Sequence, residues 1–298
     1  TFAHISDTHI RNVKYHEEYK KVFKDIYESL ENDKPDYIIH TGDIAHTKTQ
    51  LSPEYFEMCA DFLKNLADIA PTYIILGNHD GNLKNDNRQD AITPVIEALK
   101  HPNLHLLKDS GETQLDSLFC LNVLSVFDRD NWVSPTDTSK VNIALYHGAI
   151  RGCVINDEWS LENGEDDINI FTDFDFAMLG DIHRTQYLDT EERVWYAGST
   201  VQQNFGESLL KGYLLWDIRG KDTFKVEKRL FMSPRPFFTV EINQDGTLPK
   251  VDVPKNARLR LISNYNLPLA KLRRACDYAN LKWNPYSVNF VNKAGYAS

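Results

Sequence analysis

The chain has 298 residues, of which 42% are hydrophobic and 26% charged, the size and composition of one large globular domain or of a domain with a small appendage. Its 14 glycines and 12 prolines are too few for a low-complexity or fibrous chain. The longest apolar stretch, residues 118–127, is roughly half as long as the ~20 residues of a membrane-spanning helix, so a transmembrane enzyme is excluded. The sequence shows no signal peptide at its start, which predicts a cytoplasmic location.

The four cysteines, Cys59, Cys120, Cys153 and Cys276, are far apart and include no Cys-x-x-Cys spacing. This arrangement argues against a zinc knuckle and against a disulfide framework. We therefore predict a reducing compartment and thiols that pack as small apolar side chains.

The charge is unevenly distributed along the chain. The net charge is −10, but residues 219–298 contain 15 Lys and Arg against 6 Asp and Glu, a net of +9, which leaves −19 for residues 1–218. An acidic region with clustered Asp and His suits a divalent-cation site, whereas a basic appendage suits a polyanion. The alternative is that both regions are ordinary solvated surfaces.

The first part of the chain alternates between strand and helix patterns. Runs of β-favouring residues predict strands at 2–5, 37–40, 72–76, 118–126, 141–146 and 174–179. Apolar residues at three- and four-residue spacing predict helices over 16–32, over 53–66 after an N-cap at Ser52, and over 90–100. Strands that alternate with helices are typical of parallel βαβ units, so we expect helices packed on a parallel sheet.

Further strand patterns at 194–196 and 212–217, with few helices between them, predict a second sheet and hence a layered α/β sandwich. The Pro-punctuated segment 233–236 then introduces a smaller unit, with strands expected at 237–242 and 259–262 and a helix over 268–280. We thus predict two domains, residues 1–233 and residues 234–298.

Polar motifs follow five of the predicted strands. They are Asp7-Thr8-His9, Gly42-Asp43, Gly77-Asn78-His79-Asp80, His147-Gly148 and Gly180-Asp181-Ile182-His183. Ligands of open α/β sheets bind beyond the carboxyl ends of the strands, where these distant segments would converge. The tetrapeptide at 77–80 is rare by chance, and its occurrence in order with the other four motifs indicates a single site.

Carboxylate, amide and imidazole groups without thiolates suit divalent ions such as Mn²⁺, Mg²⁺, Fe²⁺ or Zn²⁺. The motifs offer enough ligands for two ions that share one carboxylate. Two ions about 3.5 to 4 Å apart can clamp a phosphate and lower the pKa of a water molecule. The motifs therefore predict phosphoester hydrolysis.

The order of these motifs resembles the calcineurin-like metallophosphoesterase superfamily. A narrower resemblance, to the SbcD-type double-strand-break repair nucleases and their bacteriophage relatives, is carried by His46, by the stretch 196–203 and by the Arg235-Pro236-Phe237 entry into the C-terminal unit. The resemblance implies a four-layer α/β/β/α sandwich with a small α+β C-terminal capping domain.

The resemblance also implies a set of metal ligands. One ion would be held by Asp7, His9 and His183, the other by Asn78 and His147, with Asp43 as the bridge. The family usually has His at the position of Asp181. An aspartate there could still coordinate through oxygen, or else the second ion site is weakened.

Three further residues have catalytic roles by resemblance. His79 would be a non-ligand that stabilises the transition state and protonates the leaving 3′ oxygen, and Asp80 would orient it. His46 would touch the substrate phosphate, unless it is a surface histidine on a loop. His4 and His40 fall inside predicted strands and are expected in the core or behind the metal ligands.

Basic residues of the C-terminal unit are candidates for DNA-phosphate contacts: Arg258, Arg260, Lys271, Arg273 and Arg274. The alternative for them is a solvated basic surface. A family role for the capping domain in DNA contact favours the first interpretation.

The function that the resemblance implies is a DNA nuclease with 3′ to 5′ exonuclease and single-strand endonuclease activities, with a dinuclear manganese centre, in double-strand-break repair and recombination. It further implies a homodimer formed through helices of the catalytic domain. An SMC-like ATPase of the SbcC type would be the partner, although its usual docking segment beyond the small unit is not evident here. The nucleoid, or the host cytoplasm for a phage protein, would be the location. Two alternatives remain open: a phosphodiesterase or phosphatase for small substrates, and a metal-poor scaffold without activity.

Overall fold

The computed structural model describes residues 1–48, 51–84, 88–157 and 159–296. Within these segments the chain forms two compact units, one of residues 1–201 and 211–231 and the other of residues 202–210 and 232–296. Among the helices of the described segments, none has the length and apolar composition of a membrane span.

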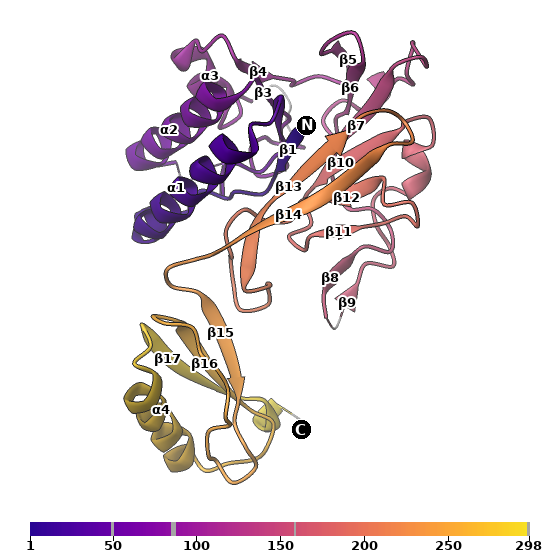
Figure 1. The fold of residues 1–298 in the computed structure, drawn as a ribbon. Coiled ribbons are helices and arrows are strands. Elements are labelled where there is room, and N and C mark those ends of the chain that lie inside the picture. Colours follow the sequence, from indigo (N-terminus) through magenta and orange to yellow (C-terminus); the bar gives the residue numbers. More distant parts are fainter. Residues whose placement is uncertain (49–50, 85–87, 158, 297–298) are drawn as a thin grey trace. The chain divides into compact units, whose positions relative to one another are not determined.

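The first unit contains two six-stranded sheets (Figure 1). The first sheet has the order β14-β13-β1-β2-β3-β4, with bounds Phe224–Met232, Leu210–Ile218, Phe2–Ile5, Tyr37–His40, Thr72–Ile74 and Leu104–Leu106. Strands β1 to β4 are parallel, and β13 pairs antiparallel with β1. Long parallel runs of this kind require crossover helices, which is the βαβ arrangement predicted from the sequence.

Three α-helices cover one side of this sheet: α1 (His16–Asp33), α2 (Pro53–Ile69) and α3 (Thr93–Leu99) (Figure 1). The predicted apolar stripe of α1 is buried, for example at Val22, Ile26 and Leu30. Helix α2 begins where Ser52 Oγ accepts a hydrogen bond from the Tyr55 N–H at 3.1 Å, the capping contact expected of a serine before a proline.

The second sheet has the order β11-β12-β10-β7-β6-β5, with bounds Gln186–Tyr187, Val194–Tyr196, Phe176–Gly180, Val141–His147, Phe119–Leu124 and Gly111–Gln114. Apolar side chains of both sheets meet in a common core, including the fully buried Trp216 of the first sheet and Ile143 and Met178 of the second. The site loops leave from this pair of sheets, so the core fixes their starting points.

The outer face of the second sheet is covered differently from what the resemblance implies. Its buried side chains pack under loops and under the 3₁₀ turn η3 (Ile168–Phe171). These loops also contain the hairpin of β8 (Val154–Asn156) and β9 (Trp159–Ser160) and the 3₁₀ turn η2 (Arg129–Asn131). The α/β class and the layered sheets are confirmed, while the described part of this fourth layer is formed by 3₁₀ turns and loops. A further 3₁₀ turn, η1 (Val13–Tyr15), precedes α1.

The second unit is a parallel three-stranded sheet with one helix on one face. Strands β15 (Phe237–Glu241), β16 (Arg258–Ser263) and β17 (Ser287–Asn292) are packed by α4 (Leu269–Trp283), and η4 (Lys293–Tyr296) follows. Residues 202–210 join this unit, although the sequence placed them in the first domain. Gln202 explains this, because its side chain both donates to and accepts from the Phe237 backbone at 2.9 Å.

The four cysteines are free thiols; three are buried and Cys276 is half-buried. His4 and His40 are also fully buried, as predicted. Burial lowers the pKa of each imidazole from its ordinary value of 6.5 to about 3, because a charged ring loses its hydration there.

We predict that His4→Gln makes the protein less sensitive to acid. Below pH 6.5 the unfolded chain takes up a proton at His4 that the folded chain does not, so the free energy of unfolding decreases as the pH falls toward 3. Between pH 7.0 and 5.5 this one group should account for roughly 1 kcal/mol. Urea unfolding of the EDTA-treated parent and variant at both pH values measures it, and equal losses in the two proteins would contradict the prediction.

Candidate functional site

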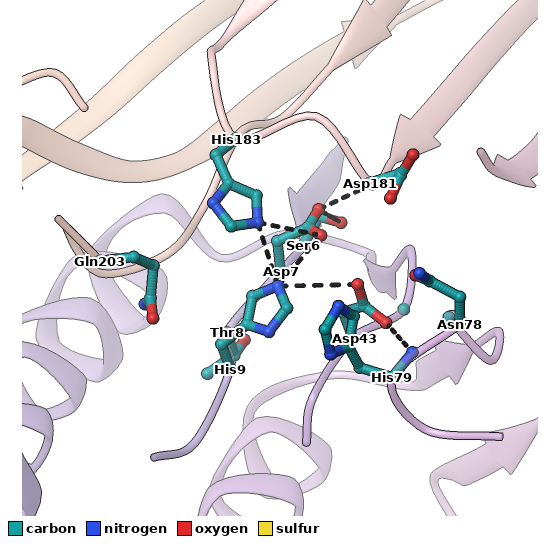
Figure 2. A network of polar contacts seen from close by, with 12 residues as sticks. Ser6, Asp7, Thr8, His9, Asp43, Asn78, His79, Asp181, His183 and Gln203 are labelled. Carbon is teal, nitrogen blue, oxygen red and sulfur yellow. Dashed lines mark hydrogen bonds and ion pairs between the residues drawn. The ribbon is translucent and has the colours of Figure 1, made fainter. Parts of the chain in front are cut away.

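The loops after five strands bring the predicted ligand side chains together. Asp7 and His9 follow β1, Asp43 follows β2, Asn78 follows β3, His147 ends β7, and Asp181 and His183 follow β10. Figure 2 shows most of these side chains converging from separate loops. Two sets of side chains within this cluster correspond to the ligands predicted for two ions.

The first set consists of Asp7, His9 and His183, whose ligand atoms all lie within 4.8 Å of one another. Asp7 Oδ1 is 3.6 Å from His9 Nε2 and 3.9 Å from His183 Nε2. The two imidazole nitrogens are themselves 3.1 Å apart (Figure 2). Asp7 Oδ1 is buried and has no hydrogen-bond partner, which leaves it available to a cation.

The second set consists of Asp43, Asn78 and His147. His147 Nε2 is 3.1 Å from Asp43 Oδ2 and 3.0 Å from Asn78 Oδ1, while its Nδ1 donates to the Thr41 carbonyl at 2.6 Å. Burial disfavours the charged ring, but the Asp43 carboxylate outweighs it and holds the pKa of His147 well above its usual value. The oxygens of Asp43 and Asn78 therefore both face His147 Nε2. A proton or a metal cation is needed between these atoms, because an unprotonated nitrogen and the two oxygens would repel one another.

Asp43 lies between the two sets. Its Oδ2 is also 3.6 Å from His9 Nε2, and its Oδ1 accepts the His79 N–H at 2.8 Å (Figure 2). Burial alone would raise the pKa of this carboxyl, but His147 outweighs burial and keeps it below the ordinary value. This position is the one expected of a carboxylate shared by two ions.

The backbone at the ligands adopts an unfavourable conformation. Asp7, His9, Asp43 and Asp181 have φ values of 49°, 45°, 58° and 102°, a region that costs a non-glycine residue roughly 1 to 3 kcal/mol. Gly77, on the loop after β3, is required by close packing rather than by its backbone angles. A Cβ atom at this position would lie 2.2 Å from Asp43 Oδ1. The loops thus approach one another too closely for a larger residue.

His79 lies beside the first ion set. Its ring is 4.9 Å from that of His9, and His79, His9 and Asp43 form a third group of close ligand atoms. The His79 Nδ1 donates to the His46 carbonyl at 2.7 Å, which fixes the ring. The His46 side chain stacks 6.3 Å from it, and burial lowers the pKa of His46 to about 4.

Asp80 was expected to orient the His79 ring, but its carboxylate has other hydrogen-bond partners. Its buried carboxylate accepts the N–H groups of Asp43, Ala45 and Gly77 at 2.8 to 2.9 Å. Burial raises the pKa of Asp80 to about 7. Asp80 therefore holds the loops that carry Asp43 and Asn78, and the His46 backbone orients His79 instead.

Asp181 lies at the edge of the cluster. Its Oδ1 is 3.7 Å from His147 Nε2, farther than the oxygens of Asp43 and Asn78, and burial raises the pKa of its carboxyl to about 6. Its backbone N–H donates to Asp7 Oδ2 at 3.0 Å (Figure 2). The side chain is thus a peripheral candidate for the second ion, whereas the backbone positions the first.

Sequence reasoning missed three groups that hold ligands. Ser6 Oγ donates to Asp7 Oδ2 at 2.6 Å, the Tyr19 hydroxyl donates to the His9 carbonyl at 2.6 Å, and the Thr41 carbonyl fixes His147. Ser6 directly precedes the motif at 7–9, so its contact with a metal ligand could have been predicted from the sequence. Tyr19 belongs to the apolar stripe of a predicted helix, which indicates packing rather than a hydrogen bond. A backbone carbonyl is present in every residue and therefore has no sequence signal.

The predicted DNA contacts divide between two faces of the second unit. Leu259 and Leu261 of β16 are buried under α4, so the alternating Arg258 and Arg260 face the other side of the sheet. Arg260 stacks 4.6 Å from the Phe205 ring. Lys271, Arg273 and Arg274 are exposed on α4. The five residues do not form one patch.

The donor set fits a pair of divalent cations. An unpartnered buried carboxylate oxygen on Asp7 and the convergence of two oxygens on His147 Nε2 are unfavourable without positive charge. Oxygen and imidazole donors suit borderline or hard ions.

A pair of sheets with Asp, Asn and His at the ends of parallel strands defines a metallophosphoesterase. The profile of the calcineurin-like phosphoesterase family matches residues 1–185, and the chain belongs to this family. The predicted superfamily is thereby confirmed. The family fold binds divalent metals in a dinuclear centre.

Two relatives are similar in sequence to most of the chain. Protein R555 of Acanthamoeba polyphaga mimivirus is 38% identical over 274 residues, which cover 87% of this chain and 20% of R555. The chain therefore spans a fifth of the length of that relative. The SbcD component of the SbcCD nuclease of Staphylococcus epidermidis is 24% identical over 270 residues, covering 80% of this chain and 71% of that protein. The resemblance to the SbcD type is confirmed as a distant similarity.

We predict that Asp80→Asn destabilises the protein by about 1 to 3 kcal/mol, because the new amide N–H₂ would face backbone N–H donors that now have an acceptor. Affinity for Mn²⁺ should fall about 10- to 100-fold, as expected when groups that orient ligands are lost. Urea unfolding and calorimetric titration measure the two effects. Asp109→Asn, at an exposed carboxylate, should change neither; equal behaviour of the two variants would refute the role of Asp80.

Proposed function

We propose that the protein is a metal-dependent DNA nuclease that hydrolyses phosphodiester bonds. The observation that carries the proposal is the position of Asp43, whose carboxylate faces both His9 and His147 and also accepts the backbone N–H of His79. One phosphate can then meet two cations and an imidazole at once.

The chemistry divides between the ions and the chain. Asp7, His9, His183, Asp43, Asn78 and His147 would hold two divalent ions, with Asp181 as a further candidate. When bound, such ions stabilise the charge on a phosphate and lower the pKa of a water molecule. Manganese is the ion we propose.

His79 supplies the proton in this proposal. Its Nδ1 is held by the His46 carbonyl, so a protonated ring carries its second proton on Nε2, the nitrogen that can reach a leaving 3′ oxygen. A ring fixed by a backbone carbonyl needs little reorganisation in the reaction. His46 would contact the phosphate through its own ring, which is half-buried beside His79.

DNA as the substrate is supported by charge and by the distant relative that is named as a nuclease. The second unit has ten Lys and Arg against five Asp and Glu, and phosphate backbones bind to such surfaces. We assign phosphate contacts to Arg258 and Arg260, which lie on one face of the sheet opposite Phe237 and Thr239 of β15. By the same resemblance we propose 3′ to 5′ exonuclease and single-strand endonuclease activities in break repair, a homodimer and an SbcC-like ATPase partner.

We predict that His79→Ala lowers Mn²⁺-dependent cleavage of labelled linear duplex and single-stranded DNA about 10²- to 10⁴-fold, the usual contribution of a general acid. Calorimetric Mn²⁺ binding should stay within threefold of the parent, because His79 is not a ligand in this proposal. The matched control is His101→Ala. His101 lies outside the site and pairs with Asp68.

Other outcomes have distinct meanings. Loss of Mn²⁺ binding in His79→Ala would make His79 a ligand and refute the acid role. A metal-loaded parent that hydrolyses bis-p-nitrophenyl phosphate but neither cuts nor binds DNA would overturn the nuclease proposal in favour of a small-substrate phosphodiesterase.

We predict that Asp181→Ala weakens one of the two Mn²⁺ binding events at least about tenfold, since a carboxylate near His147 is removed, and leaves the other within threefold. Calorimetric titration resolves the two events. Asp181→His, which introduces the usual family residue, should retain both. Equal weakening of both events in the alanine variant would contradict an assignment of Asp181 to the second ion alone.

A further inference from the structure

The second unit has a groove that the nuclease proposal does not use. A cavity of about 590 Å³ lies between α4 and the turn that follows β15. Its lining residues are Asp245, Gly246, Thr247, Leu248, Lys271, Arg274, Tyr278, Leu281 and Lys282. A volume of this size accommodates a bulky side chain with its neighbours.

The apolar part of the groove is exposed. Leu281 is 83% exposed and Tyr278 is 56% exposed, and they lie three residues apart on one face of α4. The opposite face of the helix is buried through Leu272 and Ala279. Leu281 has the highest exposure among the large hydrophobic side chains of the described residues, and exposed apolar groups beside a cavity are typical of protein-binding surfaces.

The rim of the groove is positively charged. Lys271, Arg274 and Lys282 provide three cations, and the one carboxylate among the lining residues, Asp245, already accepts both the N–H and the O–H of Thr247. An occupant with acidic groups would therefore gain favourable interactions around the whole rim.

We infer that this groove binds an acidic peptide segment of a partner protein, with a bulky apolar side chain in the cavity between Tyr278, Leu281 and Leu248. Acidic residues on both sides of that anchor pair with the rim cations. A nucleic acid would use the cations, but it would gain nothing from the exposed aliphatic side chain of Leu281. The inference concerns a site distinct from the proposed nuclease centre and does not rest on it.

The test begins with a library of random 12-residue peptides displayed on phage, selected on the full chain and counter-selected on the Leu281→Asn/Arg274→Glu variant. The peptides retained should have an excess of Asp and Glu around at least one Leu, Ile, Phe or Trp. Synthetic fluorescein-labelled copies should bind the parent with micromolar affinity in fluorescence anisotropy.

Matched variants on α4 locate the binding. Arg274→Glu should weaken the labelled peptides at least tenfold and Leu281→Asn at least fivefold. Arg273→Glu and Leu269→Asn, which alter exposed residues of α4 outside the groove lining, should stay within twofold. Circular dichroism checks that each variant keeps its helix.

Three results would overturn the inference. The first is a set of selected peptides without enrichment of Asp and Glu, and the second is an equal loss of peptide affinity in the groove variants and the control variants. The third is that no peptide binds, while labelled oligo-dT binds to the parent and only the groove variants lose this binding. The last result would assign the groove to nucleic acid. DNA cleavage by Leu281→Asn is measured in parallel, and its expected normal rate separates this inference from the nuclease proposal.

Discussion

The buried carboxylate of Asp43 is the group on which the site depends. It receives the His79 N–H on one oxygen and faces His9 and His147 with the other, so loops from both sheets are arranged around one negative charge. A buried charge is costly unless it is paired. The pairing of Asp43 with His9 and His147 requires that the loops of both sheets meet. The common core of the two sheets and the close approach permitted by Gly77 make this possible.

The convergence of the motifs could be predicted where the signal was local. Each motif follows a strand whose apolar pattern is clear, and parallel strands bring their carboxyl ends to one edge; Asp7, Asp43 and His147 therefore met as expected. Asp80 was expected to orient His79, but its carboxylate accepts backbone N–H groups of its own loop and of the loop after β2, contacts that have no residue-specific signal. The contact of the His46 carbonyl with His79 escaped prediction for the same reason.

Parts of the fold were missed for similar physical reasons. Strand β14 is rich in Lys, Arg and Glu and half-exposed, so it lacks the apolar run by which a buried strand is found. Strand β17 has the sequence Ser-Val-Asn-Phe-Val-Asn, which is neither a continuous apolar run nor a regular alternation, and its pairing with β16 depends on a helix between them. Residues 202–210 joined the second unit through Gln202, whose bonds to Phe237 connect positions 35 residues apart. Such contacts are properties of the folded chain rather than of any local pattern.

The three hydrogen bonds accepted by Asp80 have a consequence for the thermodynamics of ion uptake. Because one carboxylate holds the amides of Asp43, Ala45 and Gly77, the second and third site loops cannot relax independently. Their ligands keep a fixed separation before any ion arrives, so little conformational entropy is lost when one binds. The same rigidity limits adaptation: an ion of different radius must fit the spacing that Asp80 sets, because the loops have little freedom to follow it. Selectivity between ions of similar charge would then reside partly in a residue that touches none of them.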